Sequence, residues 1–185
     1  MTTRALLSVI LAAGRGTRMK SVLPKVLHAI AGRSLLGHVL ALADGLQAGS
    51  RLAVVIGPDM DNVRREAGRL APEASVFVQA NQLGTGDAVK AAAGALKPFA
   101  AEGGGDVVVL YADTPLLTPA TIGRLRTELA NGAHVAVLGF EPADPSGYGR
   151  LLTGSDGRLL AIREDRDATP AEKAVRLCKD RKSVV

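Results

Sequence analysis

Residues 5–19 join an apolar run to a glycine-rich, basic loop, and they read Ala5-Leu6-Leu7-Ser8-Val9-Ile10-Leu11-Ala12-Ala13-Gly14-Arg15-Gly16-Thr17-Arg18-Met19. The run from Ala5 to Leu11 has the length and apolar content of a strand that is buried on both faces, as in a parallel sheet. Gly14 and Gly16 can adopt positive φ and let backbone amides come close to an anion. The segment therefore predicts a parallel strand whose carboxyl end opens into a phosphate-binding loop.

Similar apolar runs recur along the chain, with helical patterns between them. Further strands are expected at 52–56, 75–78, 106–111 and 133–139. Helices are expected at 35–47, 60–70, 87–96 and 122–129, with Ser34 and Thr118 as caps and Pro119 at a first helical position. This alternation, with connections of crossover length, predicts a three-layer, Rossmann-like α/β fold around a mostly parallel sheet.

The pattern changes after Gly139, where prolines and glycines punctuate a loop. Two short strand-like stretches follow, around Leu151 and Leu159, with the turn sequence Gly154-Ser155-Asp156-Gly157 between them. This arrangement predicts a β-hairpin.

The composition limits the class of protein. The chain has 185 residues and 47% hydrophobic content, so it can bury one sizeable core, and its length favours one domain. The single cysteine, Cys178, cannot form an internal disulfide, and the three histidines lack metal-ligand spacing. The lack of an internal disulfide favours a reducing cytoplasm. We expect no membrane partner, because no run approaches the ~18 apolar residues of a membrane span. The apolar start is too short, and lacks the cleavage context, for a signal peptide.

Of the formal net charge of +5, the last seven residues contribute +2. In the rest of the chain, basic residues cluster around one early loop, namely Arg15, Arg18, Lys20, Lys25 and Arg33. Aromatic residues make up only 3% of the chain and cannot supply a stacking platform for nucleic acid. Basic charge gathered at one glycine-rich loop instead favours the phosphates of a small molecule, with a solvated basic face as the alternative.

A second polar segment follows the strand expected at 75–78 and reads Gln79-Ala80-Asn81-Gln82-Leu83-Gly84-Thr85-Gly86. Glutamine side chains offer paired donors and acceptors that suit a nucleobase edge, and the Gly-Thr-Gly sequence leads into a helix. Base recognition is one interpretation of this segment. A strand-to-helix turn with polar caps is the other.

A third segment, Tyr111-Ala112-Asp113-Thr114-Pro115-Leu116, follows the strand expected at 106–111. A carboxylate at the carboxyl end of a central strand lies where α/β sheets bind ligands. Mg²⁺ is usually held by one or two carboxylates together with substrate phosphates, so Asp113 is a candidate ligand. The alternative is an ordinary Asp-Thr-Pro turn.

A fourth segment, Pro145-Ser146-Gly147-Tyr148-Gly149-Arg150, has glycines that would let the backbone reach a sugar, and Glu164 follows beyond the hairpin. Three of the four segments follow expected parallel strands, which places them at one edge of the sheet. The first loop lacks both the third glycine of the dinucleotide fingerprint and the Gly-Lys-Ser/Thr ending of a P-loop, which weakens the case for an NAD(P) oxidoreductase.

These segments occur together, and in the same order, in a known family. The shared motifs are Leu-Ala-Ala-Gly-x-Gly-Thr-Arg-Met, Leu-Pro-Lys-Val-Leu-His, Gln-x-x-Gln-Leu-Gly-Thr-Gly-x-Ala, Tyr-x-Asp-x-Pro-Leu and Gly-Tyr-Gly-Arg. Over residues 6–178 the chain resembles the N-terminal domain of the bacterial bifunctional N-acetylglucosamine-1-phosphate uridylyltransferase/glucosamine-1-phosphate acetyltransferase family.

The resemblance implies the nucleotide-diphospho-sugar transferase fold and a role for each motif. The nucleotide would contact Leu11, Ala12, Ala13, Gly14 and Tyr111, and its uridine would contact Gln79, Gly84 and Thr85. The catalytic residues Arg18 and Lys25 would bind phosphates, Asp113 would hold the Mg²⁺ cofactor, and Gly149 and Glu164 would contact the amino sugar. The implied partners are UTP and N-acetylglucosamine 1-phosphate, and the products are UDP-N-acetylglucosamine and pyrophosphate.

The sequence departs from the family pattern after Cys178, where the family has an Asn-x-Gly segment for the sugar and, later, an asparagine for Mg²⁺. We interpret 1–178 as a partial nucleotidyltransferase domain and 179–185 as a tail of artificial origin, with a natural truncation or frameshift as the alternative. The left-handed β-helix acetyltransferase domain, through which the family forms trimers, is expected to be absent. An impaired enzyme, a non-catalytic nucleotide-binding fragment and a transferase for another sugar phosphate are the functions left open.

Overall fold

The computed structural model describes residues 4–14, 16, 19–47 and 49–179. The chain divides after His134 into two units, each with a sheet of its own. The first unit contains the first three polar segments, and the second unit contains the fourth.

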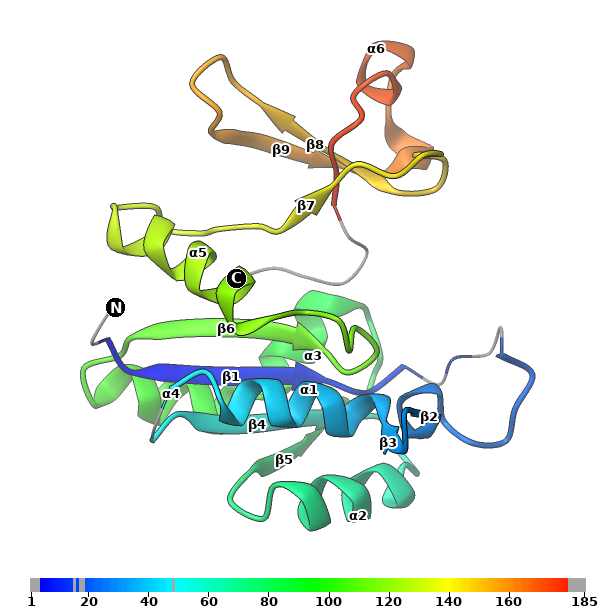
Figure 1. The fold of residues 1–185 in the computed structure, drawn as a ribbon, viewed down its shortest axis with the longest axis vertical. Coiled ribbons are helices and arrows are strands. Elements are labelled where there is room, and N and C mark those ends of the chain that lie inside the picture. Colours follow the sequence, from blue (N-terminus) through cyan, green and yellow to red (C-terminus); the bar gives the residue numbers. More distant parts are fainter. Residues whose placement is uncertain (1–3, 15, 17–18, 48, 180–185) are drawn as a thin grey trace. The chain divides into compact units, whose positions relative to one another are not determined.

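A four-stranded parallel sheet forms the centre of the first unit (Figure 1). Its strands are β1 (Leu6–Leu11), β4 (Arg51–Ile56), β5 (Ser75–Val78) and β6 (Asp106–Tyr111), in the spatial order β5-β4-β1-β6. All six residues of β1 are buried, which agrees with its nearly continuous apolar sequence. The chain adds β4 and β5 on one side of β1 and then returns to add β6 on the other, so the direction of winding reverses between β1 and β6.

Helices cover both faces of this sheet. Helices α1 (Leu35–Asp44) and α2 (Asp61–Leu70) lie on one face, and α3 (Thr85–Ala91) and α4 (Ala93–Ala101) lie on the other, as Figure 1 shows. On the second face, alternate residues of β1 and β4 pack against α3 and α4; this cluster contains Leu7, Val9, Leu11, Ala53, Val55, Ala88, Ala92 and Phe99. The expectation of a three-layer α/β fold with a mostly parallel sheet is confirmed.

Two expected helix caps form. The Ser34 hydroxyl accepts a hydrogen bond from the Gly37 amide at 3.1 Å, at the start of α1. The Thr118 hydroxyl accepts one from Thr121 at 3.2 Å, at the start of α5 (Pro119–Ala130). Each cap satisfies one of the amides that the first turn of a helix leaves without an intrahelical partner.

Three expected elements are wrong in extent. The helix expected at 35–47 ends at Asp44. The helix expected at 87–96 is divided by a break at Ala92, and α4 continues to Ala101 with Pro98 in its interior. After the break, Gly94 lies against the ring of Phe77, where a β-carbon would lie 2.8 Å from a ring atom. Of the strand expected at 133–139, only Gly139 lies in a strand, β7 (Gly139–Phe140), which pairs with β10 (Cys178–Lys179).

An ionic cluster fixes the amino end of β6. The Asp106 side chain is fully buried and lies 2.8 Å from Arg126 Nε and 3.2 Å from Arg4 Nε. Arg126 also donates to the carbonyl of Arg4 at 2.9 Å. The cluster joins α5 to the first residues of the chain, at the end of the sheet opposite to the predicted site.

The second unit is built on a four-stranded antiparallel sheet, with the order β7-β10-β8-β9. The expected hairpin is confirmed as β8 (Gly149–Thr153) and β9 (Leu159–Arg163), and Gly157 adopts a φ of 77° in its turn. The short helices η3 (Asp165–Asp167) and α6 (Pro170–Lys173) follow. Arg150 is buried and binds them both, through the Asp165 carboxylate at 3.2 Å and the Lys173 carbonyl at 3.4 Å.

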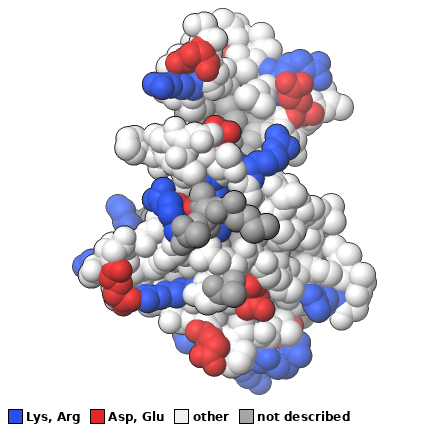
Figure 2. Space-filling model, turned by 60° about the vertical axis from the view of Figure 1, so that its left-hand side comes forward, with Lys and Arg blue, Asp and Glu red and all other residues white. Residues whose placement is uncertain are grey.

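Charged side chains of both signs are interspersed over the face of the molecule shown in Figure 2. The part of the chain that the structure describes has no helix long and apolar enough to cross a membrane.

Candidate nucleotide-binding site

The first three polar segments meet at the carboxyl edge of the parallel sheet. Leu11 and Tyr111, the last residues of β1 and β6, are register partners at the point where the winding reverses. Doubly wound sheets bind ligands in the crevice outside the strand ends at such a switch point. The prediction that these segments share one edge of the sheet is confirmed.

Backbone hydrogen bonds hold the start of the first loop. The Ala12 amide donates to the Val55 carbonyl at 2.7 Å, and the Ala112 amide donates to the Leu11 carbonyl at 3.0 Å. Leu11, Ala12 and Ala13 are buried, whereas Gly14 is exposed. The buried residues continue the core of the sheet, and the exposed glycine begins the accessible part of the loop. Arg18, the predicted phosphate ligand, lies outside the described residues.

The short helix η2 (Lys25–Leu27) follows the first loop. Its first residue, Lys25, contacts Asp113 after the end of β6. Lys25 Nζ lies 2.7 Å from Asp113 Oδ2, and the two side chains are 33% and 13% exposed. Gly16 makes this approach possible, since its φ is +67° and a β-carbon there would lie 2.5 Å from the β-carbon of Lys25. The structure thus joins the predicted phosphate ligand and the predicted metal ligand in one ion pair.

The second loop is held by the side chain of Gln79, which is buried. Its Nε2 donates to the Gly84 carbonyl at 2.9 Å and to Asp87 Oδ2 at 2.8 Å. Asp87 Oδ2 also accepts from the Leu83 amide at 3.2 Å. Gln79 therefore has a structural task in addition to its predicted contact with uridine.

Thr85 and Tyr111 link the second loop to the end of β6. The Tyr111 hydroxyl donates to Thr85 Oγ1 at 3.4 Å. The structure therefore places these two predicted nucleotide contacts beside each other. Thr85 belongs to the segment that the sequence assigns to base recognition, and Tyr111 belongs to the segment that contains the candidate metal ligand.

Sequence reasoning missed Gly57, which lies between the first two loops. A β-carbon at Gly57 would lie 2.6 Å from Gln82 Nε2 and 3.1 Å from the Ala13 carbonyl oxygen. Only glycine leaves both loops this close together at the end of β4. Its sequence signal was its position directly after an apolar strand, which is the signal that identified the other three loops.

The donor chemistry at this edge fits Mg²⁺. Asp113 supplies a hard carboxylate oxygen, and Mg²⁺ sites in nucleotide enzymes commonly use one or two carboxylates together with substrate phosphates. Lys25, which contacts this carboxylate, is a cation placed at the same point. The edge is therefore suited to a ligand that brings several negative charges.

In the second unit, the hairpin brings Gly149 next to Glu164. A β-carbon at Gly149 would lie 3.5 Å from Glu164 Oε2, because β8 and β9 pair Arg150 with Arg163 at this end. The two predicted sugar contacts are therefore neighbours within their unit, and their role stays a prediction.

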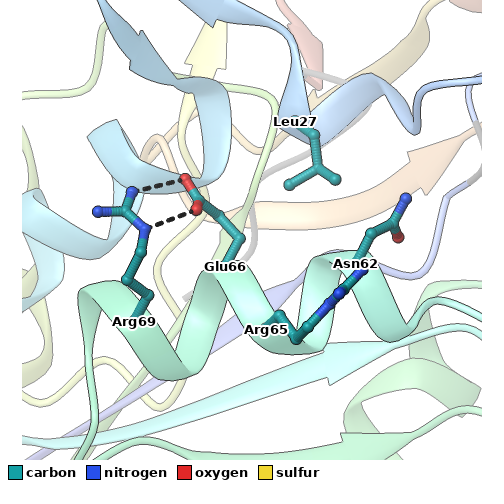
Figure 3. Close-up of a pocket in the computed structure, with 5 residues that line it drawn as sticks. All are labelled: Leu27, Asn62, Arg65, Glu66 and Arg69. Carbon is teal, nitrogen blue, oxygen red and sulfur yellow. Dashed lines mark hydrogen bonds and ion pairs between the residues drawn. The ribbon is translucent and has the colours of Figure 1, made fainter.

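A separate hollow of about 350 Å³ lies between η2 and α2 (Figure 3). It is lined by Leu27, Asn62, Arg65, Glu66 and Arg69. Glu66 accepts two hydrogen bonds from Arg69, at 3.1 and 3.2 Å, and one from Ser34 at 2.8 Å. The bonds from Arg69 are the main cause of a pKa of Glu66 below its ordinary value of 4.5; partial burial opposes this shift, and Ser34 adds to it.

Known proteins of similar sequence match nearly the whole of this chain. The chain is 61% identical to the bifunctional protein GlmU of Azorhizobium caulinodans, over 96% of this chain and 38% of that protein. It is 56% identical to the bifunctional protein GlmU of Xanthobacter autotrophicus, again over 96% and 38% of the two lengths. The chain therefore spans less than two fifths of the length of these curated relatives, and the resemblance inferred from the motifs is confirmed over that part.

Solved structures with the same fold are nucleotidyltransferases of several kinds. A putative glucose-1-phosphate thymidylyltransferase from Bacillus anthracis superposes with a TM-score of 0.76, at 18% identity, over 97% of this chain and 71% of that one. CMP:2-keto-3-deoxy-manno-octonic acid synthetase complexed with CTP gives 0.68, at 17% identity, over 98% and 73% of the two chains. These likenesses show the fold.

Residues 8–178 match the model of a protein family described as "MobA-like NTP transferase domain". This range includes the two glycine-containing loops, Lys25, Asp113 and the hairpin with Gly149 and Glu164. From this match, the strand order and the position of the loops at the switch point, the chain belongs to the MobA-like NTP transferase domain family.

Proposed function

We propose that the chain carries the uridylyl-transfer function of a bifunctional enzyme, joining UTP and N-acetylglucosamine 1-phosphate to give UDP-N-acetylglucosamine and pyrophosphate. The observation that carries the proposal is the Lys25–Asp113 pair at 2.7 Å, at the switch point and beside two loops suited to a nucleotide. The high identity to GlmU proteins over this region supports the choice of uridylyl transfer among the activities that the fold hosts.

The first loop would bind the triphosphate through its backbone amides and Lys25. In the free protein, Lys25 neutralises Asp113. A bound triphosphate would compete for the Lys25 ammonium, since phosphate oxygens are strong charge-assisted acceptors. Asp113 would then be able to hold Mg²⁺, which, when bound, neutralises negative charge on the phosphates of UTP.

The reaction itself needs no protein nucleophile. A phosphate oxygen of the sugar phosphate attacks the α-phosphorus of UTP in line, the bond to the β-phosphate oxygen breaks, and pyrophosphate leaves. Lys25 and the predicted ligand Arg18 would neutralise charge on the phosphates, and the two loops would hold the nucleotide in the reactive orientation. Gly149 and Glu164 would contact the amino sugar.

Calorimetric titration with UTP, ATP and GTP tests the nucleotide preference, and release of pyrophosphate from UTP with N-acetylglucosamine 1-phosphate tests the reaction. We expect UTP to bind most tightly and pyrophosphate release to stop when Mg²⁺ is removed with EDTA. Equal affinity for the three nucleotides would contradict the proposal. Selective binding of UTP without pyrophosphate release would instead indicate a nucleotide-binding module.

A further inference from the structure

The Gln79 side chain is held in one orientation by two acceptors. Its Nε2 donates to the Gly84 carbonyl at 2.9 Å and to Asp87 Oδ2 at 2.8 Å. Carbonyl and carboxylate oxygens only accept hydrogen bonds, so a reversed amide would place Oε1 against two acceptors. The nitrogen must therefore face Gly84 and Asp87, and the oxygen points away from them.

Asp87 also holds the backbone of the second loop at Leu83. The same oxygen, Oδ2, accepts from the Leu83 amide at 3.2 Å. The backbone of Gln79 is fixed separately, because its amide donates to the Ile56 carbonyl at 2.8 Å. One carboxylate thus joins the Gln79 side chain to the turn at 83–84, while the sheet holds the Gln79 main chain.

We propose that Asp87 is a positioning residue for base recognition: it turns Gln79 Oε1 toward the bound base and thereby favours uracil over cytosine. This inference rests on the proposed function. Uracil has a donor, N3–H, on its Watson–Crick edge, whereas the N3 of cytosine is an acceptor. An Oε1 that faces the base would accept from the uracil donor but would oppose the cytosine acceptor.

The substitution Asp87→Asn tests the inference with little change in size. An asparagine amide can donate to Gln79 Oε1, so only the Gly84 carbonyl still opposes the reversed Gln79 orientation, with Nε2 toward the base, and this orientation becomes more accessible. We expect the ratio of the CTP and UTP dissociation constants to fall by about three- to ten-fold, the effect of one hydrogen bond. Asp87→Ala removes the fixed acceptor and should lower the same ratio.

A matched control is Asp61→Asn, which removes a first-turn carboxylate from α2 as Asp87→Asn does from α3. This control should leave the ratio unchanged. In the free protein, nuclear magnetic resonance gives a second measure, since the side-chain amide protons of Gln79 should exchange with water more rapidly in both Asp87 variants than in the Asp61 variant.

The outcomes separate the two proposals. If the unmodified chain prefers UTP but both Asp87 variants keep its CTP-to-UTP ratio, Asp87 has only a structural role in the loop and the inference is wrong, whereas the proposed function stands. A uniform loss of affinity for CTP and UTP would also leave the CTP-to-UTP ratio unchanged, and it would contradict the inference in the same way. If the unmodified chain binds UTP and CTP equally, the proposed uridylyl function and the selection by Asp87 both fail.

Discussion

Lys25 and Asp113 are separated by 88 residues in the sequence, yet their charged atoms meet at 2.7 Å. The side chain of Asp113 is only 13% exposed, so the carboxylate depends on nearby polar and charged groups for its solvation. A lysine that contacts a carboxylate in the free protein can transfer to a phosphate without a large movement of the backbone. Under the proposed function, the charged groups that would bind the phosphates and Mg²⁺ therefore already lie together before the nucleotide binds.

Replacement of Lys25 by Ala should weaken UTP binding by about 1.5 to 3 kcal/mol, the value of a charge-assisted hydrogen bond. Calorimetric titration measures this change. Lys97→Ala is the control, because Lys97 is an exposed lysine on α4 and its loss should have little effect. An unchanged dissociation constant for the Lys25 variant would show that this lysine does not contact the nucleotide.

Replacement of Gly16 by Ala should destabilise the first unit by about 1 to 3 kcal/mol, because an L-residue there is strained at a φ of +67° and its β-carbon would collide with Lys25. Urea unfolding followed by circular dichroism measures the change. Gly14→Ala is the control in the same loop, since a β-carbon there meets nothing within 4 Å. Equal stability of the two variants would contradict the assigned backbone geometry at Gly16.

At the scale of elements, the sequence predicted best where local chemistry decides the structure. Ser34 and Thr118 cap helices as expected, because an N-cap hydrogen bond involves residues only a few positions apart. The expected helix at 87–96 is divided at Ala92, two residues before Gly94, which lies against the ring of the distant Phe77. Such a contact depends on the packing of the sheet and has no local signal.

Glu66 on α2 accepts a hydrogen bond from Ser34, the N-cap of α1. We expect the stabilisation that this contact gives the fold to depend on pH. Hydrogen bonds from Arg69, and then from Ser34, hold the pKa of Glu66 below its ordinary value of 4.5. A group whose folded pKa is lowered stabilises the fold above its unfolded pKa, and this contribution is lost as pH falls through the folded pKa. Glu66→Gln should therefore lower stability at neutral pH, and the difference from the unmodified chain should shrink in acid below pH 4.5.

Urea midpoints measured between pH 7 and the lowest pH at which both chains remain folded check this dependence. Glu73→Gln removes an exposed carboxylate between α2 and β5 and serves as the control. A difference between the Glu66 variant and the unmodified chain that stays constant across this range would mean that the Glu66 hydrogen bonds do not depend on its charge.

At the scale of the whole molecule, the sequence predicted the parallel sheet and the meeting of three loops at one edge. These followed from apolar runs and from the rule that parallel strands end at the same side. The role of Gly57 and the tie from Asp87 to Gln79 could not be predicted, because they depend on how loops from different strands approach one another. In the second unit, the hairpin was predicted correctly, whereas the strand expected at 133–139 was too long and β10 was not predicted. Paired segments of two described residues have no periodic pattern by which the sequence could reveal them.

The last prediction concerns the length of chain needed for turnover. The resemblance predicts asparagines after the position of Cys178 that contact the sugar and Mg²⁺, whereas residues 179–185 here read Lys-Asp-Arg-Lys-Ser-Val-Val. Since Mg²⁺ demands near-octahedral coordination, we expect a chimera that continues after Cys178 with the corresponding segment of the Azorhizobium caulinodans protein to release pyrophosphate faster than the 185-residue chain. Circular dichroism on both chains separates poor folding from an incomplete site, and Asp113→Asn in the chimera should abolish the gain. A well-folded 185-residue chain that matches the rate of the chimera would show that the added segment contributes nothing to the reaction.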